Sequence, residues 1–332
     1  MKIFEDMNKR FHIYCGDSMK CYNKWKAPTT IICDGPYGIN GYPGDLLSVE
    51  GLSEWYESHV VEWNKYATPR TTLWFWNTEQ GWATVHPMLV RLGWEFKACH
   101  VWNKGMSHVA GNTNTKTLSH LPVVTEVCVQ YVKKASFEVE NEKLTMKEWL
   151  RYEWGRTGLP FSKTNTACGV VDAASRKYFT KCHLWYMPPA EQFSKISEYA
   201  NIHGKKEGKP YFSIDGNKPL TKEEWNLLKP VFNCPFGKTN VWEVRQLRNK
   251  ERLKVNQKAV HLNQKPIEII RSLIEMSSNE GDVIWDPFAG LCTTAVASSA
   301  LERECFCAEI RTEVFDIATQ RLAEINKVLP LK

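Results

Sequence analysis

Short apolar runs alternate with amphipathic stretches over the first part of the chain. The runs are bounded by Gly, Pro or Asp and predict strands at 11–14, 29–33, 71–76, 95–102 and 121–132. Apolar positions spaced by about 3.6 residues predict helices at 52–65 and 79–92. Nearly continuous apolar strands that alternate with helices indicate βαβ units and a parallel sheet covered on both faces.

The same pattern returns near the end of the chain. Helices are predicted at 265–276, 293–300 and 314–328, with strands at 282–285 and 304–308 between them. From about 135 to 240 the chain instead mixes short helical pieces, such as 146–152, with turns rich in Gly and Pro. The pattern therefore predicts one α/β domain built from residues 1–134 and 241–332, with an insertion at 135–240.

The composition is that of a folded protein with a mild surplus of positive charge. Of 332 residues, 43% are hydrophobic and 24% are charged, and 43 Lys and Arg against 37 Asp and Glu leave a net charge of +6. This balance excludes a disordered tail, and it suits a polyanionic partner without requiring one. Since the sequence carries neither a signal core nor a stretch of ~20 apolar residues, we expect a cytoplasmic protein with no membrane partner.

The 11 cysteines are scattered and form no CxxC pair. In a reducing cytoplasm most of them are expected to be buried, unreactive thiols. A zinc set made of Cys168, Cys182, His183 and Cys234 is conceivable, but its spacing matches no zinc finger or ribbon. No metal site is predicted.

Two loops at predicted strand ends carry polar chemistry. The strand at 29–33 runs into Asp34-Gly35-Pro36-Tyr37, where a carboxylate, a turn carbonyl and an aromatic ring can together grip an amino group on a flat ring. The strand at 282–285 runs into Asp286-Pro287-Phe288-Ala289-Gly290 and then a helix, a nucleotide-type cradle. Glu309 follows the next strand, where an acid can bind both hydroxyls of a ribose. Taken alone, Gly290 fits a plain strand-to-helix turn and Glu309 a surface carboxylate.

Together the two loops resemble the signature of the AdoMet-dependent DNA amino-methyltransferases, whose catalytic loop reads Asp-Pro-Pro-Tyr and whose cofactor loop reads Asp-Pro-Phe-x-Gly-x-Gly-Thr-Thr. The segment His261-Leu262-Asn263-Gln264-Lys265-Pro266 resembles a third family motif, His-Pro-Thr-Gln-Lys-Pro. The catalytic loop comes first, 252 residues (286 − 34) before the cofactor loop, as in the circularly permuted β class. The resemblance implies a Rossmann-like fold, the cofactor S-adenosyl-L-methionine (AdoMet), and a target-recognition region between the two halves.

The resemblance also implies a role for individual residues. The catalytic residues would be Asp34, Gly35, Pro36 and Tyr37. The residues that would bind the cofactor are Asp17, Cys33, His261, Asn263, Lys265, Pro266, Asp286, Pro287, Phe288, Ala289, Gly290, Thr293, Thr294 and Glu309. Residues 1–134 would form the catalytic half, 135–240 the inserted target-recognition region and 241–332 the AdoMet-binding half.

The expected activity is site-specific transfer of a methyl group to adenine N6 of a flipped-out base in duplex DNA, as the modification part of a bacterial or phage restriction-modification system. Asp34 favours adenine because the cytosine-N4 group tends to carry Ser at this position. Cytosine N4 remains an alternative, and so does an inactive DNA-binding subunit, because Gly35 replaces a family Pro and Cys292 a family Gly. A dehydrogenase is disfavoured because no G-x-G-x-x-G motif is present.

Basic residues offer candidate contacts with double-stranded DNA. In the segment 245–258 the candidates for phosphate contacts are Arg245, Arg248, Lys250, Arg252 and Lys254, although a solvated charged loop explains them equally well. The insertion adds six candidates for groove contacts, namely Arg151, Arg156, Lys163, Arg176, Lys177 and Lys181. A cognate restriction endonuclease and a second copy of the chain are further expected partners.

Overall fold

The structure is a computed structural model and describes residues 2–5, 10–40, 45–105, 119–206, 208–234, 237–247, 254–255, 258–259 and 264–328. The chain divides into two compact units, of which the first joins residues 1–133 to 230–332 and the second comprises residues 134–229. Residues 230–240, which the sequence pattern assigned to the insertion, thus belong to the first unit. They are held there by bonds such as that from Asn240 Nδ2 to the carbonyl of Cys99 (3.1 Å).

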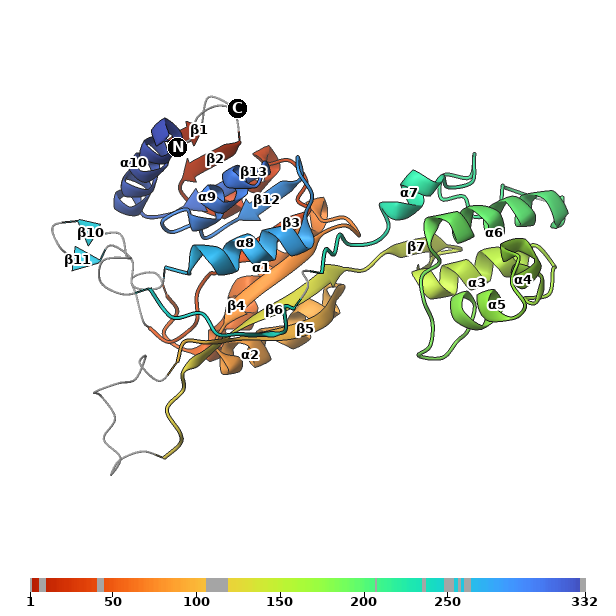
Figure 1. Ribbon diagram of the computed structural model, residues 1–332, viewed down its shortest axis with the longest axis horizontal. Coiled ribbons are helices and arrows are strands. Elements are labelled where there is room, and N and C mark those ends of the chain that lie inside the picture. Colours follow the sequence, from red (N-terminus) through yellow and green to blue (C-terminus); the bar gives the residue numbers. More distant parts are fainter. Residues whose placement is uncertain are drawn as a thin grey trace. The chain divides into compact units, whose positions relative to one another are not determined.

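A nine-stranded sheet forms the centre of the first unit, in the order β1-β2-β13-β12-β3-β4-β6-β5-β9 (Figure 1). Its strands are β1 (Ile3–Glu5), β2 (Phe11–Cys15), β3 (Thr30–Cys33), β4 (Thr72–Asn77), β5 (Trp94–Asn103), β6 (Thr125–Lys133), β9 (Val241–Trp242), β12 (Val283–Asp286) and β13 (Glu304–Glu309). The run from β2 to β4 is parallel, which confirms the predicted α/β fold class. The sheet also has an antiparallel part, because β6 inserts antiparallel between β4 and β5.

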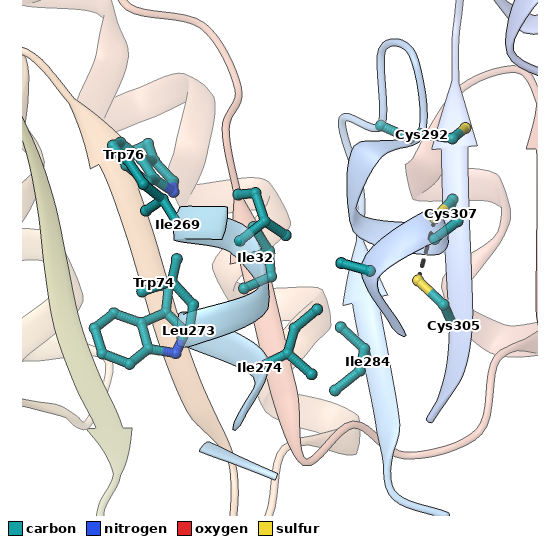
Figure 2. Packing of buried hydrophobic residues seen from close by; sticks show 14 of the residues in the cluster. Ile32, Trp74, Trp76, Ile269, Leu273, Ile274, Ile284, Cys292, Cys305 and Cys307 are labelled. Atoms are coloured by element: carbon teal, nitrogen blue, oxygen red, sulfur yellow. Dashed lines mark hydrogen bonds between the residues drawn. The ribbon is translucent and has the colours of Figure 1, made fainter. Parts of the chain in front are cut away.

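Helices cover both faces of this sheet. They are α1 (Leu52–Tyr66), α2 (Glu79–Arg91), α8 (Ile267–Ser277), α9 (Thr293–Ala300) and α10 (Thr312–Val328). Side chains alternate along each strand, so that Ile32 packs with α8, α9 and α10 on one face while Ile31 packs with α1 and α2 on the other. Figure 2 shows Leu273 and Ile274 of α8 beside Trp74 of β4 and Ile32 of β3. No described helix is long and apolar enough to cross a bilayer.

The chain changes direction across the sheet between β3 and β12. These two strands are parallel neighbours, with Trp285 opposite Ile31. From β12 the chain proceeds through α9 to β13 on one side, whereas from β3 it proceeds through α1 to β4 on the other. Such a reversal leaves room for a ligand at the carboxyl ends of the two strands. The two loops that the sequence analysis singled out begin at this point.

The second unit has an apolar core of its own, although the sequence pattern predicted an irregular region. Its elements are β7 (Ser136–Val139), β8 (Glu142–Thr145), α3 (Met146–Arg156), α4 (Lys163–Cys168), α5 (Ala173–Tyr178), α6 (Ala190–His203) and α7 (Lys222–Asn226). Large aromatic side chains such as Trp149, Trp154 and Trp225 are buried in it. A separate short hairpin of β10 (Lys254–Val255) and β11 (Lys258–Ala259) lies in the first unit.

Candidate active site at the ends of strands β3 and β12

The loop Asp34–Tyr37 leaves the end of β3, and two side chains hold its backbone. Tyr56 Oη and Asn77 Nδ2 both donate to the carbonyl oxygen of Pro36, at 2.9 and 3.1 Å. The side chain of Asp34 is 25% exposed, so it remains accessible at the sheet edge. These bonds fix the turn and leave the carboxylate of Asp34 facing outward from the end of the strand.

Asp45 is a second anchor of this loop. Its Oδ1 accepts hydrogen bonds from the backbone amides of Tyr37 and Gly38, both at 2.8 Å, and its Oδ2 accepts one from Ile39 at 3.1 Å. Amide bonds to a carboxylate are stronger than those to a neutral acceptor. Asp45 was not among the residues predicted for the site, because nothing in its local sequence pattern indicates that it binds residues 37–39.

Gly35 brings the two loops into contact. A Cβ atom at this position would lie 2.6 Å from Tyr56 Oη and 2.8 Å from Cδ2 of Phe288, closer than real Cβ atoms approach. Any larger residue would therefore push the ring of Phe288 away from the catalytic loop. Gly35 stands where the family has Pro, and its lack of a side chain allows the cofactor loop to pack closely on the catalytic loop.

Lys265 lies against the catalytic carboxylate. Its Nζ donates to Oδ1 and Oδ2 of Asp34 at 2.8 and 3.0 Å and to Tyr37 Oη at 3.1 Å, and it lies 3.4 Å from Oε2 of Glu126. Tyr37 Oη also contacts Asp34 Oδ1 (3.0 Å) and Glu126 Oε2 (3.2 Å). Lys104 completes the cluster, with its Nζ 2.9 Å from Oε1 of Glu126. The resemblance assigned Lys265 to the cofactor, whereas its contacts here are with the catalytic loop.

Electrostatics distinguish the members of this cluster. Burial raises the pKa of Tyr37 well above its ordinary value, and the neighbouring Asp34 and Glu126 raise it further, so its hydroxyl stays protonated. Burial alone would raise the pKa of Glu126, but Lys265 and Lys104 lower it below the ordinary value. Burial opposes the charge on Lys265, yet Asp34 and Glu126 raise its pKa. The charged forms of Glu126 and Lys265 therefore stabilise each other.

Asp286, at the end of β12, is a buried carboxyl group in a different situation. Burial raises its pKa to about 7, Thr294 and the amide of Phe288 lower it, and Asp34 and Glu309 raise it further. The Phe288 amide donates to its Oδ1 at 3.2 Å. Among the described residues no cationic side chain forms an ion pair with Asp286. A positively charged ligand group would supply the missing counter-charge.

Acidic residues also follow the two neighbouring strands. Oε2 of Glu309, after β13, accepts from the amide of Gly290 at 3.0 Å, and Oε1 accepts from the amide of Arg311 at 2.9 Å. Asp17, after β2, accepts from the amide of Met19 at 2.9 Å. The ends of β2 and β13 are joined by a bond from the Gly16 amide to the carbonyl of Glu309 (2.8 Å). The structure thus brings Asp17, Glu309 and Asp286 to successive strand ends.

The remaining residues predicted to bind the cofactor fall into two groups. Pro287, Ala289 and Gly290 lie in the buried turn between β12 and α9, Thr293 and Thr294 are the first residues of α9, and Pro266 is buried at the start of α8. The thiol of Cys33 is fully buried in the apolar cluster under α1, where it contacts the backbone of Gly35. His261 and Asn263 lie outside the described residues.

Cys292 occupies the position of the second family Gly. Its φ of 57° lies in the left-handed region that glycine adopts easily. Its side chain is fully buried and contacts Cys307 of β13, as Figure 2 shows. The thiol therefore packs into the core, and the backbone keeps the conformation typical of a glycine.

Of the predicted DNA contacts, Arg245 is described and exposed. Lys254 lies in the short strand β10, and Arg248, Lys250 and Arg252 lie outside the described residues. Within the second unit, Arg151 and Arg156 have internal roles: Arg151 donates to the carbonyl of Phe179, and Arg156 pairs with buried Glu153 at 2.5 Å. In the described part of the chain no group of three or more His, Cys, Asp or Glu could hold a metal ion.

Comparison with known proteins agrees with this geometry. A family model described as DNA methylase (N6_N4_Mtase) matches residues 29–320. The Type II methyltransferase M.HindIII of Haemophilus influenzae is 33% identical over 207 residues, 58% of this chain and 60% of that protein. M2.MboI of Moraxella bovis is 28% identical, and the match covers 98% of this chain and 92% of that protein.

The first curated relatives are matched over a quarter to three fifths of their length (24%, 60% and 24%). Among solved structures, the cytosine-N4-specific PvuII DNA methyltransferase superposes with a TM-score of 0.52 at 10% identity, covering 96% of this chain and 92% of that one. At this identity the likeness concerns the fold. The family model covers most of the chain, and it includes both loops described above. The chain belongs to the N6/N4 DNA methylase family.

Proposed function

We propose that the protein transfers a methyl group from AdoMet to the exocyclic N6 of adenine in duplex DNA, at a specific site. The observation that carries this proposal is the meeting of the two loops: Asp34 follows β3, Asp286 ends the adjacent parallel strand β12, and Phe288 packs on Gly35. A carboxylate that accepts amine hydrogens thus lies beside a nucleotide-type cradle. Membership of the DNA methylase family supports the same reaction class.

The residues at the strand ends fit AdoMet. Asp286 is a buried carboxyl that lacks a cationic partner among the described residues, and it suits the amino group of the methionine part. Glu309 and Asp17 suit the ribose and the base edge of the nucleoside. When bound, AdoMet would supply a methyl group on a sulfonium centre: as the nitrogen–carbon bond forms, the sulfur–carbon bond breaks and leaves a neutral thioether, and the nitrogen releases one proton to solvent.

The chain's own residues then act on the amine. Its lone pair is delocalised into the ring, which makes it a poor nucleophile. Asp34 and the carbonyl of Gly35 accept its two hydrogens and draw the nitrogen towards a tetrahedral geometry in which the lone pair is available. Positioning and electrostatic stabilisation supply the rate, and no covalent enzyme intermediate is required.

The target base must leave the duplex to reach this site. Stacking on Tyr37 was expected from the sequence, but its ring is 6% exposed and its hydroxyl is bonded in the Lys265 cluster. We therefore propose that the side chain of Tyr37 moves when the base enters, so that one face of its ring becomes accessible to the base.

The second unit is proposed as the target-recognition region. Lys163, Arg176, Lys177 and Lys181 are all exposed and lie in or beside α4 and α5. Tyr186, which is also exposed, is tied to this surface by its amide bond to the carbonyl of Lys177 (2.9 Å). Cationic side chains interleaved with an exposed aromatic ring suit the phosphates and bases of DNA. Arg245 is proposed as an additional phosphate contact from the first unit.

Methyl transfer to defined DNA tests the proposal. The protein is incubated with labelled AdoMet and unmethylated duplex DNA, the DNA is digested to nucleosides, and the labelled product is identified by mass spectrometry. Label in N6-methyladenine supports the proposal. The Asp34→Asn variant keeps the shape of the side chain and is expected to lose transfer while AdoMet binding by calorimetry stays within about threefold of wild type. Unchanged turnover in that variant would refute the role of Asp34.

Cytosine N4 is the second candidate, because the PvuII enzyme that shares this fold is cytosine-N4-specific. Label in N4-methylcytosine from the same digest would establish it. Absence of AdoMet binding would instead favour an inactive DNA-binding subunit. The relatives named Type II methyltransferases also support a role in restriction and modification, with a cognate endonuclease and a second copy of the chain as proposed partners.

A further inference from the structure

Glu126 is a buried acid that lies between two lysines at the catalytic end of the sheet. Its side chain is 17% exposed, and its two oxygens have different partners: Oε1 faces Lys104 Nζ at 2.9 Å, and Oε2 faces Lys265 Nζ at 3.4 Å and Tyr37 Oη at 3.2 Å. The reaction described above gives no role to Glu126 or to Lys104. Neither residue stands in a recognisable motif.

The topology explains why these residues reach the catalytic carboxylate. Strand β6 runs antiparallel to β4, so its first residues lie at the same edge of the sheet as the last residues of β3 and β4. Glu126 is the second residue of β6 and pairs with Trp102 of β5, and Lys104 follows the end of β5. Glu126 and Lys104 therefore lie beside the Asp34 loop although they come from a separate part of the chain.

Lys104, Glu126, Lys265 and Asp34 contact one another in this order. Lys104 holds one oxygen of Glu126, and the other oxygen faces both groups that donate to Asp34, namely Lys265 Nζ and Tyr37 Oη. Lys265 Nζ also lies 5.3 Å from the ring centroid of Tyr37 and 5.1 Å from that of Trp76, which limits where its ammonium can move. Two carboxylates and two ammonium groups balance to zero charge.

We propose that Glu126 and Lys104 are positioning residues: Lys104 holds Glu126, and Glu126 holds Lys265 beside Asp34, so that this carboxylate stays oriented towards the amine of the target base. This inference rests on the proposed function. Glu126 also gives Lys265 a second carboxylate partner. The ammonium of Lys265 therefore stays paired when the amine of the target base donates its hydrogen bond to Asp34. Neither Glu126 nor Lys104 touches the base.

Each substitution breaks one link of this arrangement. Removing the carboxylate of Glu126 leaves Lys265 with Asp34 and Tyr37 as its hydrogen-bond partners and removes the partner of Lys104. Removing the ammonium of Lys104 releases Oε1 of Glu126, so that this carboxylate is no longer held beside Lys265.

The test is single-turnover methyl transfer at saturating AdoMet and DNA. Glu126→Gln and Lys104→Met are both expected to lower the plateau rate by about tenfold, because Asp34 loses its orientation, while AdoMet affinity stays within about threefold of wild type. The double variant should lose about as much as the slower single variant, because both residues act through the same contact with Lys265.

An exposed ion pair on the neighbouring strand provides matched controls. Lys97 and Glu95 of β5 pair at 2.8 Å with both side chains exposed, so Lys97→Met and Glu95→Gln remove the same charges away from the site. Both should match wild type in plateau rate. Melting temperature and AdoMet affinity are measured for each variant, and if Glu126→Gln does not fold, Lys104→Met and the double variant provide the test.

Lower plateau rates with AdoMet affinity retained, and a double variant about as slow as the slower single variant, support the positioning role. Plateau rates like those of the controls, or rate losses that multiply in the double variant, overturn it and leave a structural role only. If the wild type transfers no methyl group to any DNA although it is folded, the proposed function fails and the inference fails with it. If the wild type transfers a methyl group and only the positioning variants behave like the controls, the inference alone fails.

Discussion

Replacing Asp286 by Asn should stabilise the free protein at neutral and alkaline pH while it weakens AdoMet binding. The carboxyl of Asp286 is buried at the end of β12, and burial raises its pKa from 3.8 to about 7. Above pH 7 the folded protein must keep a buried negative charge that has no cationic partner among the described residues. An amide of the same shape keeps the acceptor for the Phe288 amide and removes the charge.

The magnitude follows from the difference between the two pKa values. A pKa of about 7 in the folded protein against 3.8 in the unfolded chain corresponds to a cost on the order of 4 kcal/mol when the group is ionised. Because the folded pKa is the higher one, the folded protein binds a proton that the unfolded chain releases between pH 4 and 7. Stability from this group is therefore fully present below about pH 4 and is lost as the pH rises to about 7.

The assay compares free energies of unfolding in urea, for wild type and the Asp286→Asn variant, from about pH 5 to 8, followed by tryptophan fluorescence. The advantage of the variant should grow with pH and level off above about pH 7, at up to about 4 kcal/mol. Asp316→Asn is the control, since the side chain of Asp316 is 57% exposed and pairs with Lys2 at 3.4 Å on the surface. Its difference from wild type should stay near zero at every pH.

Calorimetry with AdoMet provides the second half of this prediction. A cationic group that pairs with Asp286 favours the ionised carboxyl, so at pH 6 the wild type should release close to one proton on binding, visible as a dependence of the heat on the buffer. The Asn variant should release none and bind at least about tenfold more weakly at pH 8. A difference in stability that is flat between pH 5 and 8 would refute the reasoning about burial of the charge.

Three further substitutions have definite expectations. Gly35→Ala should destabilise the protein by about 1 to 3 kcal/mol in urea unfolding, because the new Cβ meets Phe288, and an unchanged stability would contradict that packing. Asp45→Asn should cost about 1 to 3 kcal/mol and lower methyl transfer more than AdoMet affinity, because the amide nitrogen cannot accept from Ile39; equal loss of both would show a wider disturbance. Cys292→Gly should leave AdoMet affinity within about threefold by calorimetry, because the thiol packs against Cys307; a clear gain in affinity would show that it obstructs the ligand.

The sequence predicted those parts of the site that follow from local sequence patterns. Strands β3 and β12 are uninterrupted apolar runs, and each is followed by a turn with Asp, Pro and Gly. Such runs with their turns indicate a strand end that carries polar residues, whatever the rest of the fold. The contact of Phe288 with Gly35 is different, because it depends on the two strands being neighbours.

The partners that sequence reasoning missed depend on strand direction. The run at 121–132 indicates a strand but not its orientation, and only an antiparallel β6 brings Glu126 to the edge where Asp34 lies. Lys265 was assigned to the cofactor through a family motif, while its nearest partners in the structure are the two oxygens of Asp34. A sequence pattern carries no information about which of several acids a buried lysine will contact.

In the second unit the sequence contained a helical pattern that the prediction did not use. In α6, Phe193, Ile196 and Ala200 are buried at a spacing of three and four residues, the pattern of an amphipathic helix. The turns rich in Gly and Pro around it led to the interpretation of an irregular region. Arg151 and Arg156 were interpreted as groove contacts, whereas the structure uses them to bind a carbonyl and a buried carboxylate within the unit.

The two acids at the centre of the site are treated differently by the chain, and this difference defines their roles. Asp34 has its own counter-ion in Lys265, and in the proposed reaction it accepts hydrogens from a neutral amine. Asp286 has no such partner among the described residues, and the charge of Asp34 contributes to its raised pKa. Ionisation of Asp286 is therefore linked to the arrival of a cation, and that cation also relieves the repulsion between the two carboxylates. Under the proposed function these separate environments divide the work of the site: Asp34 acts on the substrate, and Asp286 selects a positively charged cofactor.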